Sequence, residues 1–505
     1  MMFFKGQLEK IKQKAPHFEE RDYDDFLEEK IGFKKEEQAF PMNPVQLEHI
    51  LEKVLSDIDD FQKRVLSIPS GQHIIIFSMG GLVNQDLLYS TIVEPFILRI
   101  ENGEQSPVND LKQVLYSAMI REPTSWKDLI QAILDGKAIC HVEGMKPAVI
   151  PIETTEKRNI SPPETEYQVY GPKSGFVEDF ATNVALLRRF IRDPRFKAKQ
   201  FEIGSLSHNK VAMLYLEEYA DPDLCREVEK RIKSVETDTI IQAGHLGKKI
   251  KDSPMSVFPL TSQTERPDRA AFALSQGKVV IVVDNSTFVL YVPTTLIELY
   301  ETSEENYDLV WNTTFIRLLR LVCLFIATML PSLYVALVGF HPELLPAKLA
   351  LTMTESRSNI PLPAPAEALL MMFALDVLVE SSIRLPSFVG QTIGIVGGIV
   401  IGTAAVEAGI VSSLMIIIVS ITAIASFTVP TWSLALAWRI VRYGFLMITS
   451  ILGIYGLMLG VILVTIHLCH LQSFGKPYLS PLSPLNAKQF YDVFIRFATR
   501  KDRST

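Results

Sequence analysis

Charged side chains stand inside an apolar stretch near residue 376. Residues 367–385 (EALLMMFALDVLVESSIRL) have a helical pattern, and they carry Glu367, Asp376, Glu380 and Arg384. The last three are spaced by four residues, so they share one face of a helix. Acidic groups buried among membrane helices are costly and are candidates for function by default. A ring of such carboxylates around a pore would favour cations.

The same residues also fit a helix that lies in the membrane interface. In that case Glu380 and Arg384 form an exposed ion pair, which contributes only about 0.2–0.5 kcal/mol. The sequence leaves both interpretations open. Pro331 is a further candidate, because a proline inside an apolar helix frees a backbone carbonyl. It predicts either a simple kink or a gating hinge.

No constellation in the chain predicts catalysis. A nucleophile, a base and an orienting group do not occur together, so we expect no enzyme, no cofactor and no metal centre. Residues 264–268 (TERPD) resemble a catalytic loop only in composition. Five residues are instead predicted to make contacts between subdomains or between protomers: Glu178, Asp179, Glu265, Arg266 and Asp268. The net charge of −7 leaves no basic surface for nucleic acid.

The apolar segments that must position Asp376 begin near Trp311. A helix needs about 20 apolar residues to cross about 30 Å of hydrocarbon. The membrane domain is predicted at 311–474 with about four spans, at 321–340, 389–406, 410–429 and 443–466. The helix at 367–385 is too polar to count as a fifth span. Residues 475–505 form a basic tail.

The preceding residues read as α/β protein in two subdomains, after a charged extension at 1–45. The first, 46–160, is predicted to contain a helix at 45–66, a strand at 73–78, a helix at 86–99 and a hairpin at 138–152. The second, 171–310, is predicted to contain helices at 177–191 and 223–235 and strands at 201–205, 211–216, 279–283 and 288–292. The fold class is therefore an α/β region followed by a multi-span α-helical membrane domain.

Charge placement conflicts over the topology. The N-terminus lacks the apolar core of a secretory signal, so we expect the α/β region to stay on the cytoplasmic side. Four spans then place the basic tail inside, as the positive-inside rule requires, but place Arg439 and Arg442 outside, against that rule.

Short motifs in a fixed order resemble the A subunits of spore germinant receptors, the GerA family. The similarity runs from about His73 to Pro484. The matching stretches are 171–179 (GPKSGFVED), 264–268 (TERPD), 330–337 (LPSLYVAL), 340–343 (FHPE), 365–371 (PAEALLM), 384–386 (RLP), 401–409 (IGTAAVEAG), 426–427 (SF) and 473–478 (SFGKPY).

The resemblance implies a multi-pass protein of the spore inner membrane whose N-terminal region faces the spore core. Its partners would be a transporter-like B subunit, a lipoprotein C subunit and further copies of itself. The A subunits of this family are expected to oligomerise into an ion-conducting path that triggers germination. Two alternatives stay open, a non-conducting binding or scaffold subunit and a paralogous subunit of the spore dipicolinic acid channel.

The segment Thr294 to Thr314 connects the predicted α/β region to the first span, which Arg317 and Arg320 precede. Any signal or assembly force from the α/β region must pass through it. We therefore expect this segment to act as a coupling point.

Overall fold

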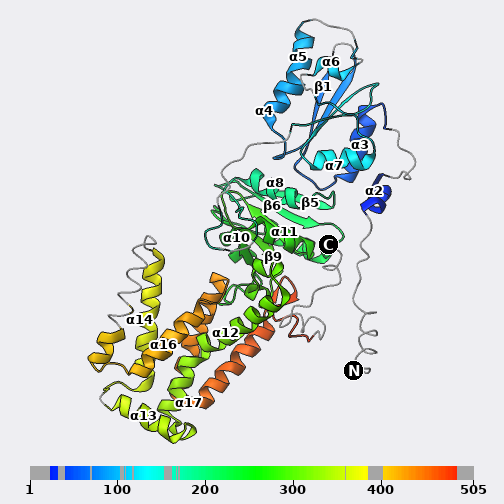
Figure 1. The fold of residues 1–505 in the computed structure, drawn as a ribbon. Coiled ribbons are helices and arrows are strands. Elements are labelled where there is room, and N and C mark those ends of the chain that lie inside the picture. The colour runs from blue at the N-terminus through cyan, green and yellow to red at the C-terminus, as the bar shows by residue number, and fades with distance from the viewer. Residues whose placement is uncertain are drawn as a thin grey trace. The chain divides into compact units, whose positions relative to one another are not determined.

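The computed structural model describes residues 23–31, 40–68, 71–102, 107–108, 110–115, 119–152, 162–166, 168, 171–358, 360–384, 398 and 402–485. The chain divides into two compact units (Figure 1). Unit 1 comprises Met1–Tyr167, Pro172–Ile250 and Gln263–Val292, and unit 2 comprises Gln168–Gly171, Lys251–Ser262 and Pro293–Thr505.

The first half of unit 1 is an antiparallel sheet between two layers of helices. Its strands follow the order β1 (Phe61–Ser67), β2 (His73–Met79), β3 (Ala138–Val142) and β4 (Ala148–Ile150). Alternate residues of β2 face opposite cores, as the two-residue period of a strand requires. Ile75 and Phe77 share a core with residues of α3 (Pro44–Val54) and α7 (Trp126–Leu134). Ile74 and Ile76 face residues of α4 (Gln85–Leu88), η1 (Tyr89–Val93), α5 (Glu94–Glu101) and α6 (Leu111–Val114). The predicted strand at 73–78, hairpin at 138–152 and helix at 86–99 are confirmed.

The predicted helix at 45–66 is wrong in its second half. Helix α3 ends at Val54, Asp57 adopts a positive φ of 60°, and Phe61–Ser67 forms the edge strand β1. The apolar spacing fits a helix as far as Leu66. However, β1 pairs with β2 along its whole length, and such tertiary pairing overrides a local periodicity.

The second half of unit 1 is a five-stranded sheet. The strand order is β5 (Phe196–Ile203), β6 (Asn209–Leu216), β8 (Val279–Val283), β9 (Val289–Val292) and β7 (Ser262–Thr264). Helices α8 (Phe180–Phe190) and α11 (Pro267–Ser275) share one core with the sheet, whereas α9 (Pro222–Lys233) and α10 (Ala243–Ile250) also contact its strands. The elements predicted for this half are confirmed, although β5 begins at Phe196 rather than Phe201.

A buried ion pair joins the two halves of unit 1. Arg188 on α8 is 1% exposed and donates from Nε and Nη2 to the two carboxylate oxygens of Asp60, each over 2.6 Å. The turn before β1 also pairs with β5, because Asp59 N donates to Ala198 O and Ala198 N donates to Asp57 O. A bidentate pair fixes direction as well as distance. We call the Arg188–Asp60 ion pair the joint. It therefore holds the two halves of unit 1 in one relative orientation.

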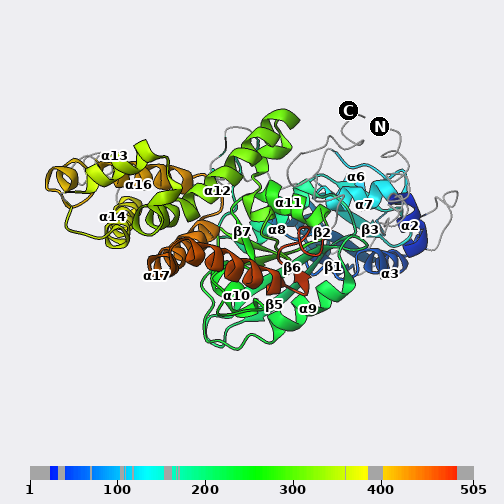
Figure 2. The ribbon, with the colours of Figure 1, turned by 90° about the horizontal axis from the view of Figure 1, so that it is seen from below.

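Unit 2 is built on apolar helices. The main ones are α12 (Val310–Gly339), α14 (Ala364–Arg384), α16 (Ser413–Ser426) and α17 (Trp432–His470), with η4 (Pro342–Leu344) and α13 (Ala347–Arg357) between α12 and α14. Among the described residues, α12 and α17 are long and apolar enough to cross a membrane, and α16 is a shorter apolar helix. Helices α12 and α17 run side by side, and α14 lies beside α16 (Figure 2).

Helix α17 reverses direction at Gly453. This residue has φ 59° and ψ −137°, a conformation open in practice only to glycine. A Cβ at Gly460 would lie 2.8 Å from the ring of Phe445, and one at Gly456 would lie 2.5 Å from the carbonyl of Ile448. Residues 445 and 460 would be about 22 Å apart in a straight helix. Residues 432–452 and 454–470 are thus two antiparallel arms of a hairpin, and the predicted single span at 443–466 is wrong.

The helices of unit 2 run between two common ends. At one end, Thr431 donates to the carbonyl of Leu299, and Leu468 packs in a cluster with Leu296 and Leu299. At the other end, a Cβ at Gly453 would lie 2.9 Å from Phe340. Residues 310 and 470 therefore lie at the same end. The predicted span at 389–406 lies mostly outside the described residues.

Loss of the joint should destabilise unit 1. We expect Arg188→Ala to lower the free energy of unfolding of the full chain in detergent by about 3–5 kcal/mol, because Asp60 then stays buried without a partner. Chemical denaturation followed by circular dichroism measures this change. The matched control is Arg192→Ala, since the side chain of Arg192 is 57% exposed and pairs with Asp135 at the surface. Its expected cost is below about 1 kcal/mol, and equal costs for the two variants would contradict the prediction.

Candidate functional site

The segments before the first and after the last helix of unit 2 are hydrogen-bonded together. We call residues 251–262, 293–308 and 471–482 the collar. Leu296 N donates to Tyr478 O over 2.9 Å, and Thr294 N donates to Ser473 Oγ over 2.9 Å. Ser473 Oγ in turn donates to Leu260 O over 2.8 Å. Burial raises the pKa of Tyr478, so its phenol stays neutral. Residues 475–478, the start of the predicted basic tail, thus belong to the collar at this end of the bundle.

A single buried carboxylate binds two arginines at the start of α12. Glu305 accepts from Arg317 Nε over 2.7 Å and from Arg320 Nη1 over 2.5 Å, and it is 5% exposed. Arg320 also donates to Tyr300 O over 2.9 Å, and Arg317 to Glu301 over 3.1 Å. Charge-assisted bonds of this kind are short and directional. The first turns of α12 are therefore fixed to the collar, as a coupling point requires.

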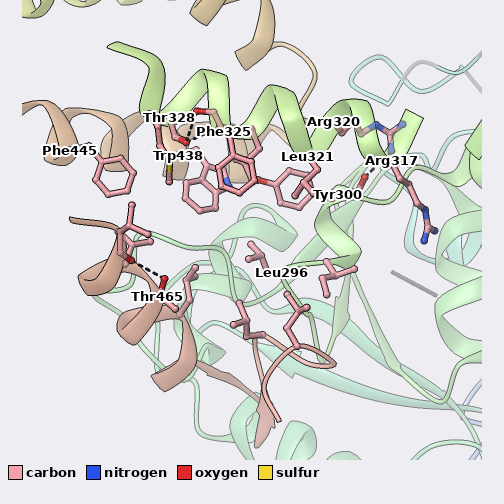
Figure 3. A pocket seen from close by; sticks show the side chains of 18 of the residues that line it. Leu296, Tyr300, Arg317, Arg320, Leu321, Phe325, Thr328, Trp438, Phe445 and Thr465 are labelled. Carbon is pink, nitrogen blue, oxygen red and sulfur yellow. Dashed lines mark hydrogen bonds between the residues drawn. The ribbon is translucent and has the colours of Figure 1, made fainter. Parts of the chain in front are cut away.

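An apolar pocket of about 350 Å³ lies between α12, both arms of α17 and the collar. Figure 3 shows Leu321, Phe325, Trp438 and Phe445 along its walls. Arg317 and Arg320 lie at one end of the pocket. The volume falls in the range of ligand pockets, about 300–1,000 Å³. Its lining suits apolar groups.

Glu367 is fully buried and bonded inside the bundle. Its Oε1 accepts from both the backbone N and the Oγ of Ser412, each over 2.6 Å. Tyr334 of α12 contacts the same Ser412 Oγ at 3.2 Å, and Arg357 lies 3.6 Å from the second carboxylate oxygen. Glu367 therefore holds Ser412, the N-cap residue of α16, and ties α16 to α14. This position is central to packing and is closed to solvent.

Asp376 is partly buried and forms a second charge cluster among the helices. Its carboxylate accepts from Arg442 Nη2 at 3.1 and 3.2 Å and from the Tyr443 hydroxyl at 2.5 Å, and Arg439 lies 3.4 Å away. The sequence predicted Asp376 as a site residue, whereas Arg439 and Arg442 entered only the prediction of the membrane topology. A charge among membrane helices requires a partner of opposite charge. The two arginines, three residues apart in an apolar segment, therefore indicated where the partners of Asp376 lie.

The remaining candidates of the membrane half lie in different settings. Glu380 is exposed on α14. The side chain of Arg384 lies outside the described residues, so its pairing with Glu380 stays a prediction. Pro331 is buried inside α12, which runs through it from Val310 to Gly339. Its role as a hinge also stays a prediction.

The candidates in unit 1 make contacts within that unit. Asp179 caps α8 by accepting from Thr182 N over 2.8 Å, and the carbonyl of the exposed Glu178 accepts from Asn285 N. Glu265 accepts from Glu164 N and Thr165 N over 2.9 and 3.1 Å and so holds the segment between the halves.

Arg266 donates through Nε and Nη2 to Asp268, and both are buried. The buried ion pair between the halves of unit 1 is instead formed by Arg188 and Asp60, which the sequence analysis did not identify. A role for Arg266 and its neighbours between protomers stays a prediction.

Comparison with known proteins identifies the family. Residues 49–505 match the family described as Bacillus/Clostridium GerA spore germination protein. The chain belongs to the GerA family. The predicted resemblance is thereby confirmed, and a role in spore germination follows from it.

Several curated GerA-related proteins align with most of the chain. The chain is 36% identical over 465 residues to the membrane protein YfkQ of Bacillus subtilis (strain 168), which covers 92% of this chain and 91% of that one. It is 34% identical over 429 residues to spore germination protein KA of the same organism, with 84% and 78% covered. It is 39% identical over 398 residues to spore germination protein A1, also of B. subtilis, with 79% and 83% covered.

One solved structure from a germinant receptor is similar to part of the chain. It is the N-terminal domain of the A subunit of the Bacillus megaterium spore germinant receptor GerK3, with 22% sequence identity and a TM-score of 0.40. The match covers 50% of this chain and 96% of that one.

The hairpin of this GerA-family chain can be tested by cross-linking. We expect Phe445→Cys combined with Gly460→Cys, in a background without other cysteines, to form an intramolecular disulfide in isolated membranes. The reason is that the arms touch there, and the ring that would crowd a new Cβ at 460 is removed. Mass spectrometry of the linked peptides measures it.

The matched control pair is Met447→Cys with Ile462→Cys, which has the same sequence separation but exposed side chains. A disulfide in the control but not in the test pair would contradict the hairpin.

Proposed function

We propose that this chain is the A subunit of a nutrient germinant receptor in the spore inner membrane. Several copies assemble, and their apolar helices surround an ion-conducting path that opens during germination. Family membership over residues 49–505 and the relatives named as spore germination proteins support the receptor role. The ion path is supported by the charged residues buried among the helices of unit 2.

The topology proposed here places the collar and the N-terminal region at the spore core. Helix α12 and the two arms of α17 each run between the two ends of unit 2. Arg439 lies about two turns from the start of the first arm, at the collar end. Arg439, Arg317, Arg320 and Lys476 then fall on one side. The hairpin at Gly453 thereby removes the conflict with the positive-inside rule that a single span at 443–466 created.

The cluster around Asp376 is the observation that carries the ion path. A buried ion pair is weak support for stability, because well-packed apolar residues at the same positions are often as stable or more so. Charges kept among apolar helices therefore point to function. Asp376 and Arg442 come from α14 and the first arm of α17, so movement of either helix must break or exchange this pair.

Glu380 lies one turn beyond Asp376 and is exposed on α14. We propose that it faces the axis of the assembly, where copies of Glu380 form the carboxylate ring. Asp376 adds negative charge beside this ring, and Glu367 supports the packing. A B subunit that senses the nutrient and a lipoprotein C subunit complete the receptor.

Two alternative functions are compatible with the same fold, and in neither does the chain form the ion path of a nutrient receptor. In the first, the chain is a scaffold that holds the other subunits. In the second, it belongs to a paralogous dipicolinic acid channel. Reconstituting the purified chain into planar bilayers separates conducting from non-conducting subunits, and light scattering of the particle gives the number of copies. A non-conducting monomer would support the scaffold.

Neutralising the two acids should slow ion release. We expect spores that carry Asp376→Asn and Glu380→Gln to release monovalent cations about tenfold more slowly after nutrient addition, which corresponds to about 1.4 kcal/mol of lost cation stabilisation. An ion-selective electrode measures the release. The matched control is Glu355→Gln on the exposed α13, which should leave the rate unchanged. Unchanged release in the double variant would overturn the cation path.

A further inference from the structure

A second, smaller cavity lies close to the Asp376 cluster but does not include Asp376. It has a volume of about 120 Å³ and lies between α12, the end of α16 and the first arm of α17. Leu324, Phe427 and Trp432 form apolar walls, and Ser426, Arg439 and Arg442 supply its polar lining. The charged groups that line this cavity are thus both positive.

The charge around this cavity does not balance. Asp376 faces both Arg439 and Arg442, so one carboxylate stands against two guanidinium groups. Glu367 is bonded to Ser412, and Glu380 is exposed outside the cavity lining. Residues 385–406, most of which lie outside the described part of the chain, contain no acidic side chain. Within the described part of the chain, the guanidinium groups of Arg439 and Arg442 therefore share a single carboxylate, which leaves a surplus of positive charge at the cavity.

Arg442 also has an unused donor. The residue is 2% exposed, and its Nη2 donates to both oxygens of Asp376. Its buried Nε–H has no hydrogen-bond partner within the described part of the chain. Buried hydrogen-bond donors in proteins nearly always have an acceptor. A buried donor without one therefore indicates an acceptor that is not part of the described chain. An acceptor in the cavity would supply one.

These groups select the class of ligand. A guanidinium presents a planar fork that fits the oxygens of a carboxylate or a phosphate. The apolar walls lower the local dielectric and strengthen the attraction to a negative group. Water occupies about 30 Å³ per molecule in the liquid, so a cavity of about 120 Å³ accepts a group of only a few heavy atoms. A cation is excluded by the two arginines.

We propose that this cavity binds a small oxyanion, a carboxylate or phosphate group, on Arg439 and Arg442. The group comes either from a dissolved anion or from the head of an anionic lipid, since the cavity lies toward the collar end of the helices. Binding neutralises the surplus positive charge and satisfies Arg442 Nε. This proposal does not depend on whether the chain conducts ions.

The experiment uses the full chain in nanodiscs of zwitterionic lipid at constant ionic strength. Inorganic phosphate and sodium acetate are titrated separately. The readouts are the thermal unfolding midpoint and tryptophan fluorescence, because Trp432 lies against Arg439 with 6.0 Å between ring centre and guanidinium. We expect a saturable rise of the midpoint and a matching fluorescence change with at least one of the two anions.

Arg439→Gln is the decisive variant. It removes the surplus charge but leaves Asp376 paired with Arg442, so we expect it to fold and to bind the anion at least about tenfold more weakly. Arg442→Lys keeps the charge and loses Nε, and an intermediate effect is expected. Arg189→Gln, an exposed arginine of α8, is the matched control and should respond like the unchanged protein.

The two sources give different outcomes. Saturation by phosphate or acetate in zwitterionic discs identifies a dissolved anion. A higher midpoint only in discs that contain phosphatidylglycerol, lost in Arg439→Gln, identifies a lipid headgroup. A response to neither source, or an equal response in Arg439→Gln and the unchanged protein, would overturn the proposal.

Discussion

A charge placed among apolar helices must find its partner inside the bundle, because lipid offers none. This constraint explains where the polar groups of unit 2 lie. Glu305 binds Arg317 and Arg320, Glu367 binds Ser412, and Asp376 binds Arg442 and Tyr443. Glu367 and Asp376 each join segments that are 45 or more residues apart, whereas Glu305 joins the collar to the nearby start of α12. The pairings therefore determine which helices are in contact and how neighbouring helices are aligned along their axes.

The elements that local patterns describe were predictable from the sequence. The strands of unit 1 follow from their apolar, β-branched composition, and β2, β6, β8 and β9 lie where expected. The edge strand β1 was not predictable, because among the described strands it pairs with β2 alone, across a turn, and its exposed residues carry no strand alternation. The joint of Arg188 and Asp60 connects residues 128 positions apart, so no local pattern reveals it.

The candidate site was predictable in part, for a similar reason. Asp376 and Glu367 stand out because acids are rare in apolar segments, but their partners come from other helices. The reversal at Gly453 was hidden because the chain stays apolar through it. Glycine is common in membrane helices, so Gly453, Gly456 and Gly460 did not distinguish a hairpin from a straight span. Only backbone conformation and close packing separate the two.

The collar has a consequence for the order in which the chain is made and folded. Its bonds join Thr294 to Ser473 and Ser473 to Leu260, over separations of 179 and 213 residues. Contacts so far apart form late, because the whole intervening chain must first be ordered. Unit 1 needs no residue beyond Val292 and can fold while the rest is still being synthesised. The collar can close only after the last helix has been inserted, so a closed collar marks a complete and correctly inserted chain.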